Sequence, residues 1–375
     1  MGRARPVGVV VQNRKHSRWE CDANFLPTGA SKLPNKVEDK VYFRVHEVSK
    51  SGLTLLTSLR NEEALQPGMR LELHLNIPTV SNFNLIIEVI HTRSIQIDNR
   101  DQLNVGVKIL NSSKRLERSI AQYLVQFSSD ATLKALKEEK LIPKSIAEAV
   151  NYTTVKSEGD YQEVLNVRWQ AYKSANKVDV GDPNSMRCKY DKWDRIIIAK
   201  HQGKVVSSCL LIFPGPGDQL EIEEDMNRSL DDFIPDRTKI CEFTRLSALP
   251  DYRGSDLLHG MFREVARTCL AEGRDITFGS ADERMAKVYE GIGYRKTGIE
   301  FYMERYKGIK HYSMIGNIRE SVLSGKKVKA HYWPFLWKPL AKYLDRNHRS
   351  EISFSNRLHL WVYKAIMPIL KRLRS

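Results

Sequence analysis

The pattern of apolar residues changes along the chain, and this change limits the folds open to it. From about Lys40 to Leu110 the sequence holds short strand-like runs separated by glycine, proline-glycine and polar turns, at 41–48, 53–58, 69–77, 85–93 and 103–110. From about Tyr161 to Tyr306, helix-like and strand-like runs alternate. We therefore expect a multidomain α+β chain, with a small β-barrel or sandwich followed by a mixed α/β domain.

The domain boundaries follow from the segments beside these two regions. Leu116, Ile120, Leu124 and Phe127 recur at helical spacing and predict a helix that closes the first domain. A polar segment rich in lysine and glutamate follows. With 375 residues, each of two domains can bury its own core, and we expect a first domain at 1–127, a linker at 128–152, a second domain at 153–325 and a tail at 326–375.

Charge and cysteine usage narrow the possible partners. The 60 Lys and Arg residues exceed the 45 Asp and Glu residues by 15, which favours phosphate-bearing ligands, anionic lipid or an acidic protein partner. No nucleic-acid-binding motif is visible, so we expect no specific nucleic-acid partner. The five cysteines stand singly, without partners at zinc-ligand spacing, which predicts no metal site and a reducing, cytoplasmic setting. We find no signal-peptide core and no apolar segment of roughly 18 residues, so neither secretion nor a membrane span is expected.

Two arginines and a serine-glycine turn form the first candidate site. Arg14 and Arg18 lie four residues apart before the first strand-like run, and guanidinium groups can grip phosphates bidentately. Glu47, Ser49 and Gly52 follow at a strand-to-turn boundary, where a small hydroxyl and a glycine permit the close approach of a nucleotide. Taken singly, either motif is also typical of a solvated basic arm or an ordinary hairpin turn.

In this order the two motifs resemble those of the PilZ domain, a cyclic di-GMP receptor with an RxxxR motif and a [D/N]xSxxG turn. The resemblance covers roughly residues 10–127. It implies that Arg14 and Arg18 hold the guanines and phosphates of cyclic di-GMP, while Ser49 and Gly52 complete the pocket. Glu47 replaces the usual Asp or Asn, and its longer carboxylate can either bond a guanine edge or repel phosphate.

A strand, a turn and a helix between about 241 and 272 provide the second candidate site. Arg253, Gly254 and Ser255 precede the helix, whose N-terminus offers unpaired amides to a phosphate or pantetheine group. With Tyr289–Tyr294, this stretch resembles the GNAT acyltransferase fold, in which Arg253, Gly254 and Ser255 would open the acyl-donor loop. Asp256 and Leu258 replace small residues of the family's loop, so we expect an acyl donor other than acetyl-coenzyme A.

A narrower resemblance is to the N-acyl amino acid synthases and the related acyl-homoserine-lactone synthases, over roughly 155–310. It rests on three spacings in order: Arg168 with Tyr172, Asp191 with Asp194, and Glu242 with Arg245. These enzymes use long acyl chains, typically from acyl carrier protein. A further arginine of the lactone synthases is missing from 207–211, which favours plain N-acylation.

Amide formation suggests roles for the substrate-binding residues. Arg168 or Arg245 can bind a substrate carboxylate bidentately, and Tyr172 accompanies Arg168 in the family pattern. Asp191 and Asp194 can attract the incoming amine or fix the arginines. Alternatively, these two aspartates are solvated or cap helices.

Two further residues are candidates for proton transfer. Glu242 can remove a proton from the substrate ammonium, directly or through water, and Tyr289 can protonate the departing thiolate. The structural alternatives are an ion pair between Glu242 and Arg245 and a Tyr289 that only packs.

The tail is basic and aromatic. Twelve Lys and Arg residues but two Asp and Glu residues lie between Lys326 and Ser375, and apolar residues from Leu358 to Leu373 fall roughly on one helical face. Such a helical tail can lie in an anionic membrane surface, receive an acidic carrier protein, or pack on the preceding domain.

Together these features predict a cytoplasmic enzyme, peripheral to the inner face of the membrane if the tail binds lipid. A PilZ-like domain would sense cyclic di-GMP and control a GNAT-like N-acyltransferase. The expected reaction moves a long acyl chain from an acyl carrier protein or coenzyme A thioester to an amino acid. The competing hypothesis is a non-enzymatic cyclic di-GMP effector that has lost its donor site, with Asp256 and Leu258 as its evidence.

Overall fold

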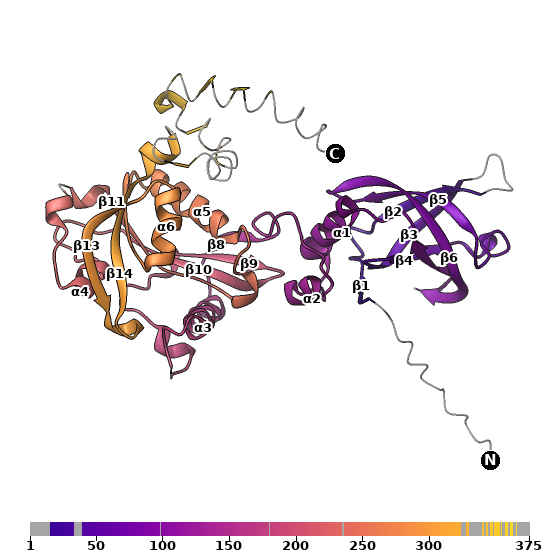
Figure 1. Cartoon of the computed structure of the whole chain (residues 1–375), viewed down its shortest axis with the longest axis horizontal. Coiled ribbons are helices and arrows are strands. Elements are labelled where there is room, and N and C mark those ends of the chain that lie inside the picture. The colour runs from indigo at the N-terminus through magenta and orange to yellow at the C-terminus, as the bar shows by residue number, and fades with distance from the viewer. Residues whose placement is uncertain are drawn as a thin grey trace, which may run out of the picture. The chain divides into compact units, whose positions relative to one another are not determined.

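The computed structural model describes residues 16–33, 40–97, 99–179, 181–234, 236–323, 328–329 and scattered positions between 340 and 365. The chain divides into two compact units, at 1–149 and 150–375 (Figure 1). Arg14 and most of the tail at 326–375 lie outside the described residues, so the predictions made for them stay predictions. In the described part of the chain, no helix has the length and apolar character needed to cross a membrane.

The first unit is built on one antiparallel sheet of seven strands. These are β1 (Arg18–Glu20), β2 (Thr28–Lys32), β3 (Lys40–Ser49), β4 (Gly52–Thr57), β5 (Arg70–Ile77), β6 (Ser81–Ile97) and β7 (Arg100–Ile109). They are ordered β1-β3-β2-β5-β6-β7-β4, and β4 also pairs with β3, so the pairings form a circuit that returns to β3. Side chains of β5 alternate between exposed polar and buried apolar, as expected of a strand with one face on the core. All five predicted strands are present, whereas β1 and β2 were not predicted.

The predicted closing helix is α1 (Lys114–Phe127), which is capped by Ser113 and buries Leu116, Ile120 and Leu124. Residues 128–149, expected as a linker, instead pack within the first unit. The short helix α2 (Leu133–Glu138) buries two leucines. Gln122 of α1 donates to the Ser145 carbonyl at 3.0 Å and accepts from the Ser145 amide at 2.9 Å. The sequence concealed this packing because lysines and glutamates separate the few apolar residues of this segment.

The second unit contains a mixed sheet of seven strands in the order β13-β14-β12-β11-β10-β9-β8. The strands are β8 (Asn151–Thr154), β9 (Ile196–His201), β10 (Lys204–Ile212), β11 (Ile240–Ala248), β12 (Ile276–Ala281), β13 (Arg295–Met303) and β14 (Ile309–Asn317). All neighbouring strands are antiparallel except β11 and β12, which are parallel. This two-unit α+β architecture agrees with the sequence prediction.

Helices cover both faces of this second sheet. Helix α3 (Glu158–Ser174) lies on one face, and α5 (Leu257–Ala271) and α6 (Glu283–Gly291) lie on the other (Figure 1). Residues 196–199 of β9 are consequently buried on both faces, which explains their continuous apolar sequence. The short helix α4 (Glu221–Met226) was not predicted.

Single turns of 3-10 helix stand at Leu59–Asn61, Pro183–Met186, Trp193–Arg195, Asp231–Phe233, Arg237–Lys239, Pro250–Tyr252, Glu304–Tyr306 and Arg349–Glu351, and a π turn at Arg319–Leu323.

Candidate functional site

A cavity of about 340 Å³ opens where β11 and β12 separate. The two strands pair only between Ile240–Glu242 and Ile276–Phe278. Beyond these residues, 243–248 of β11 line the cavity on one side and Ser280 and Ala281 of β12 line it on the other. Strand amides that have no β12 partner can bond a thioester carbonyl and stabilise the negative charge of a tetrahedral intermediate. We call this space the donor cavity.

A β-bulge turns Arg245 out of the regular strand. The pairing of β10 with β11 shifts between Ser208 and Leu210, and Arg245 takes a left-handed φ of 52°. Such backbone strain in a residue other than glycine is commonly found at functional sites. The Arg245 guanidinium donates to Glu221 Oε1 through Nη2 at 2.6 Å and Nε at 3.0 Å, while part of the side chain lines the donor cavity.

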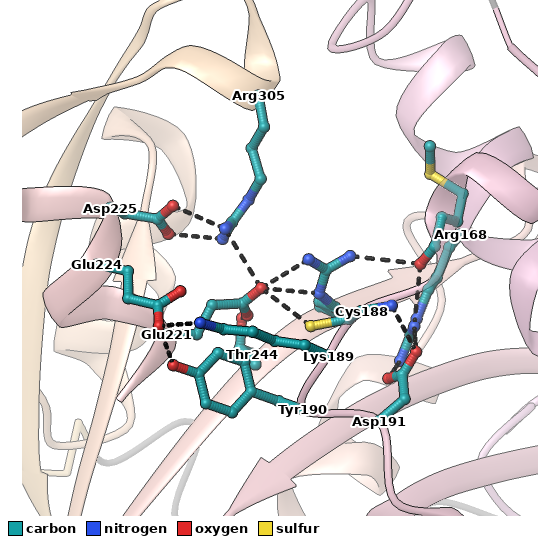
Figure 2. Close-up of polar contacts among 12 residues, drawn as sticks. Arg168, Cys188, Lys189, Tyr190, Asp191, Glu221, Glu224, Asp225, Thr244 and Arg305 are labelled. Carbon is teal, nitrogen blue, oxygen red and sulfur yellow. Dashed lines mark hydrogen bonds and ion pairs between the residues drawn. The ribbon is translucent and has the colours of Figure 1, made fainter. Parts of the chain in front are cut away.

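Glu221, at the start of α4, is the centre of a buried polar cluster that sequence reasoning missed. Its carboxylate also accepts from the Thr244 hydroxyl at 2.8 Å and forms an ion pair with Arg305 at 3.2 Å. Figure 2 shows Arg305 between Glu221 and Asp225. Arg305 Nη2 lies 2.6 Å from Asp225 Oδ2. Burial would raise the pKa of Glu221, but the two arginines hold it below the ordinary value. In the sequence, only an isolated Glu-Ile-Glu-Glu-Asp run marks this helix.

The pKa of Asp225 shifts in the opposite direction to that of Glu221. Burial raises the pKa of Asp225 to about 6, although Arg305 opposes the shift, and the charge of Glu221 raises it further. Although Arg305 contacts both carboxylates, the ionised form is favoured at Glu221 and disfavoured at Asp225.

Arg168 and Asp191, which the sequence assigned to substrate, bind each other. Arg168 is fully buried and donates to the two oxygens of Asp191 at 2.8 and 2.9 Å (Figure 2). Asp191 also accepts from the Tyr161 hydroxyl at 2.8 Å and the Cys188 amide at 3.0 Å. Neither residue lines the donor cavity. The pair attaches the 187–195 loop to α3, a structural role that leaves no exposed guanidinium edge for a substrate.

Asp194 lies apart from Asp191. Its side chain is 73% exposed and 3.4 Å from Arg195, so the two aspartates do not form one acidic site. Tyr172, by contrast, lines the donor cavity and packs against Tyr306, with ring centroids 4.9 Å apart.

Glu242 is buried beside α4 and is absent from the lining of the donor cavity. Its Oε1 accepts from the Ile222 amide at 3.1 Å, and no described residue bonds its Oε2. Burial raises the pKa of Glu242 well above the ordinary value, with the charges of Glu221 and Asp225 adding to the shift. This position and protonation suit a residue that fixes β11 to α4 better than a base that touches the substrate.

Tyr289 of α6 reaches the donor cavity. Its ring packs against Phe243, Phe262 and Tyr294, with centroids 5.3 to 5.7 Å apart. Burial raises the pKa of the Tyr289 phenol, so the hydroxyl stays protonated and able to donate.

The acyl-donor loop stands at the mouth of the same cavity. Arg253, Gly254 and Ser255 line it and precede α5, and Gly254 takes a φ of 74° with open space around it. Arg253 donates to the Ala171 carbonyl at 2.5 Å. Burial and the nearby Arg284 both lower the pKa of Arg253, and Arg284 and Lys177 also line the cavity. The mouth therefore carries positive charge suited to a phosphate.

The first unit brings the nucleotide motifs together on β1, β3 and β4. Arg18 pairs in register with Ser49, and its Nη1 lies 3.3 Å from Glu47 and 3.2 Å from Thr54. Thr54, which sequence reasoning missed, donates to Glu47 at 2.7 Å. Although burial would raise it, the pKa of Glu47 is lowered by Thr54 and Arg18, so the carboxylate is ionised.

Ser49 and Gly52 form a tight turn between β3 and β4. The Ser49 hydroxyl bonds the amide and the carbonyl of Gly52, both at 3.0 Å. A Cβ atom at position 52 would lie 2.6 Å from the Val107 carbonyl oxygen, so the close approach of β7 requires glycine here.

Comparison with known families agrees with both halves of this description. A model of the PilZ domain matches residues 12–126, and a model of the N-acyl amino acid synthase FeeM matches residues 163–314. The chain joins a PilZ domain to an acyltransferase domain. Both resemblances predicted from the sequence are confirmed by these matches. No curated protein sequence matches the chain.

Solved structures similar to each domain are distant in sequence. The PilZ domain is similar to that of YcgR from Escherichia coli bound to c-di-GMP, with 19% identity over 35% of this chain and 100% of that one and a TM-score of 0.27. The acyltransferase domain is similar to FeeM, an N-acyl amino acid synthase from uncultured soil microbes, with 9% identity over 46% and 92% of the two chains and a TM-score of 0.39. It is also similar to Escherichia coli ElaA, at 12% identity, 45% and 99% coverage and a TM-score of 0.33.

Proposed function

We propose that the acyltransferase domain moves a long acyl chain from the thioester of acyl carrier protein or coenzyme A to the amino group of an amino acid. The observation that most supports this reaction is the donor cavity. There, β11 amides without a β12 partner, the loop at 253–255 and the Tyr289 phenol surround one space. This combination supplies binding for the donor, stabilisation for an oxyanion and a proton for the departing thiolate.

The mouth of the cavity suits the phosphate of a pantetheine arm. Lys177, Arg253 and Arg284 provide positive charge there. Asp256 stands directly before α5, where its carboxylate would repel the negatively charged pyrophosphate of coenzyme A. Acyl carrier protein, whose arm holds a single phosphate, is therefore the preferred donor.

The acceptor amino acid needs partners for its carboxylate. Arg245 and Arg305 both line the cavity, and both already share Glu221. A substrate carboxylate can bond their remaining N–H groups without separating either arginine from Glu221. A carboxylate bound there would bring the amino group near the strand amides proposed to bind the thioester carbonyl.

We further propose that the PilZ domain binds cyclic di-GMP through Arg14, Arg18, Ser49 and Gly52, and that binding alters acyl transfer. Glu139, directly after α2, contacts the residues between Arg14 and Arg18. Glu139 accepts from the Ser17 amide and bonds His16 Nδ1, both at 2.8 Å, and its carbonyl accepts from Lys50 at 3.0 Å. A ligand that moves His16 and Ser17 would break these contacts and so affect the segment leading to the acyltransferase domain.

Mass spectrometry of lipid extracts tests the reaction in cells. Cells expressing the wild-type chain should accumulate an N-acyl amino acid that cells expressing Arg245→Ala lack. Arg195→Ala, which removes a partly buried arginine outside the cavity lining, is the matched control and should retain the product. If none of the cells contain a new amide although the proteins are folded, the non-enzymatic effector becomes the better account.

A further inference from the structure

His311 lines the donor cavity, and the roles described above do not use it. It lies on β14 in register with Phe301 of β13, and its side chain is 2% exposed. Its Nδ1 is 2.8 Å from the Ile309 carbonyl oxygen. Because a carbonyl can only accept, Nδ1 carries the proton and Nε2 carries the lone pair. Within the described part of the chain, no residue bonds Nε2.

The surroundings of His311 favour the neutral imidazole. Burial is the largest cause and lowers the pKa of His311. Lys177, beyond the end of α3, and Arg305, in the 304–306 turn, lower it further, whereas Asp282 at the start of α6 and the Ile309 carbonyl oppose the shift. Tyr306 also lies nearby, with its ring centroid 6.0 Å from that of His311. At neutral pH the ring is therefore uncharged and able to accept a proton.

The position of His311 suits a general base better than the position of Glu242 does. The Glu242 carboxyl lies outside the cavity lining, and burial raises its pKa well above the ordinary value, which disfavours the carboxylate form that a base at a substrate amine requires. His311 shares the cavity with Tyr289, the proposed acid, and with Arg245 and Arg305, the proposed carboxylate partners. A base and an acid thus line the same space from β14 and α6.

We propose that His311 Nε2 is the general base of acyl transfer, an assignment that rests on the proposed function. Nε2 takes a proton from the substrate ammonium, and the freed nitrogen lone pair attacks the thioester carbon. A carbon–nitrogen bond forms, the carbon–sulfur bond breaks, and the thiolate is protonated by Tyr289. The nitrogen then loses a second proton to the Tyr289 phenolate, which regenerates the phenol. His311 releases the first proton to solvent. The overall reaction converts thioester and ammonium to amide, thiol and one proton.

The pH dependence of His311→Gln tests this assignment. Glutamine keeps a donor for the Ile309 carbonyl but cannot accept a proton from an ammonium. With palmitoyl-acyl carrier protein and an amino acid mixture, thiol release and amide mass are measured from mildly acidic to alkaline pH. The variant should be about 100-fold slower at neutral pH, a usual contribution of a general base. The loss should shrink as pH rises, because the free amine needs no base. His259→Gln, on α5 and outside the cavity lining, is the control and should match the wild type throughout.

A purely structural role for His311 gives a different result. If the ratio of wild-type to variant rates stays constant with pH, or if the variant is as fast as the wild type, His311 is not the base, while the proposed reaction stands. If the folded wild-type chain forms no amide at any pH, both the reaction and this assignment are overturned. Thermal unfolding of each variant separates loss of the base from loss of the fold.

Discussion

Arg245 and Glu221 are joined by a buried ion pair of 2.6 Å at the edge of the donor cavity. Arg245 reaches this position only because a bulge in β11 places its backbone at a left-handed φ of 52°. Such a conformation costs on the order of 1–3 kcal/mol in a residue other than glycine. Hydrogen bonds to a charged group, each contributing about 1.5–3 kcal/mol, can offset that cost. The pair therefore holds the strained strand open beside the cavity.

Replacement of Glu221 by glutamine should strongly destabilise the acyltransferase domain. The change leaves Arg245 and Arg305 buried with less negative charge near them. Breaking a buried ion pair by removing one partner typically costs about 3–5 kcal/mol. The free energy of unfolding, measured with urea, should fall by an amount in that range.

Asp194→Asn is the matched control for this change. Its carboxylate is 73% exposed, and surface ion pairs contribute about 0–1 kcal/mol. An equal effect of the two substitutions on the free energy of unfolding would contradict the central place of Glu221.

Asp225 should make the stability of the domain depend on pH. Its pKa is raised from 3.8 to about 6 on folding, so the folded protein binds this proton more tightly than the unfolded chain. The stabilisation is fully present below the unfolded pKa and is lost as pH rises through the folded one. The free energy of unfolding of the wild type, relative to Asp225→Asn, should therefore fall between about pH 4 and pH 6. The exposed Asp232→Asn change should leave this profile unaltered.

Tyr289→Phe should slow acyl transfer in a manner that depends on the leaving thiol. With a pantetheine thioester, loss of the proton donor should reduce kcat by about 100-fold. An aryl thioester releases a weakly basic thiolate that needs no proton, so the variant should approach the wild type with that donor. Tyr294→Phe is the control, because Tyr294 packs in the same aromatic group but its hydroxyl accepts from the Thr277 hydroxyl at 2.8 Å. A loss that is equal for the two donors would assign Tyr289 to packing alone.

Arg18→Ala should weaken binding of cyclic di-GMP by the PilZ domain. Loss of charge-assisted bonds worth about 1.5–3 kcal/mol corresponds to an increase in Kd of about 10- to 100-fold. Titration calorimetry on the full chain measures the effect. Arg70→Ala, whose side chain is 72% exposed on β5, should bind like the wild type. If Arg18→Ala binds cyclic di-GMP as tightly as the wild type, Arg18 is not part of the binding site.

The sequence predicted the elements with strong periodicity. The five short strands of the PilZ domain, helix α1, strand β11 and helix α5 all appear close to the expected positions, because each has a clear pattern of apolar residues. The segment at 128–149 was different. Its three leucines and Ile146 are buried although Ile142 is exposed, and local composition does not reveal the contacts with distant residues that decide which of them are buried.

The candidate site was predicted in outline but not in its pairings. Spacing identified Arg168, Asp191 and Arg245 as polar residues of one region, and the structure places all three near the cavity or behind it. Spacing did not reveal that Arg168 is neutralised by Asp191, nor that Glu221 rather than Glu242 is the partner of Arg245. Those pairings depend on a bulge and on a short helix, whose sequence signals are weak.

Reconstitution with the purified full chain tests the central claim most directly. Wild type and Arg18→Ala are incubated with palmitoyl-acyl carrier protein and an amino acid mixture, with and without cyclic di-GMP, and the products are identified by mass spectrometry. We predict an N-acyl amino acid whose rate of formation changes with cyclic di-GMP in the wild type and not in Arg18→Ala. A folded wild-type chain that binds cyclic di-GMP but leaves the thioester intact would contradict the account.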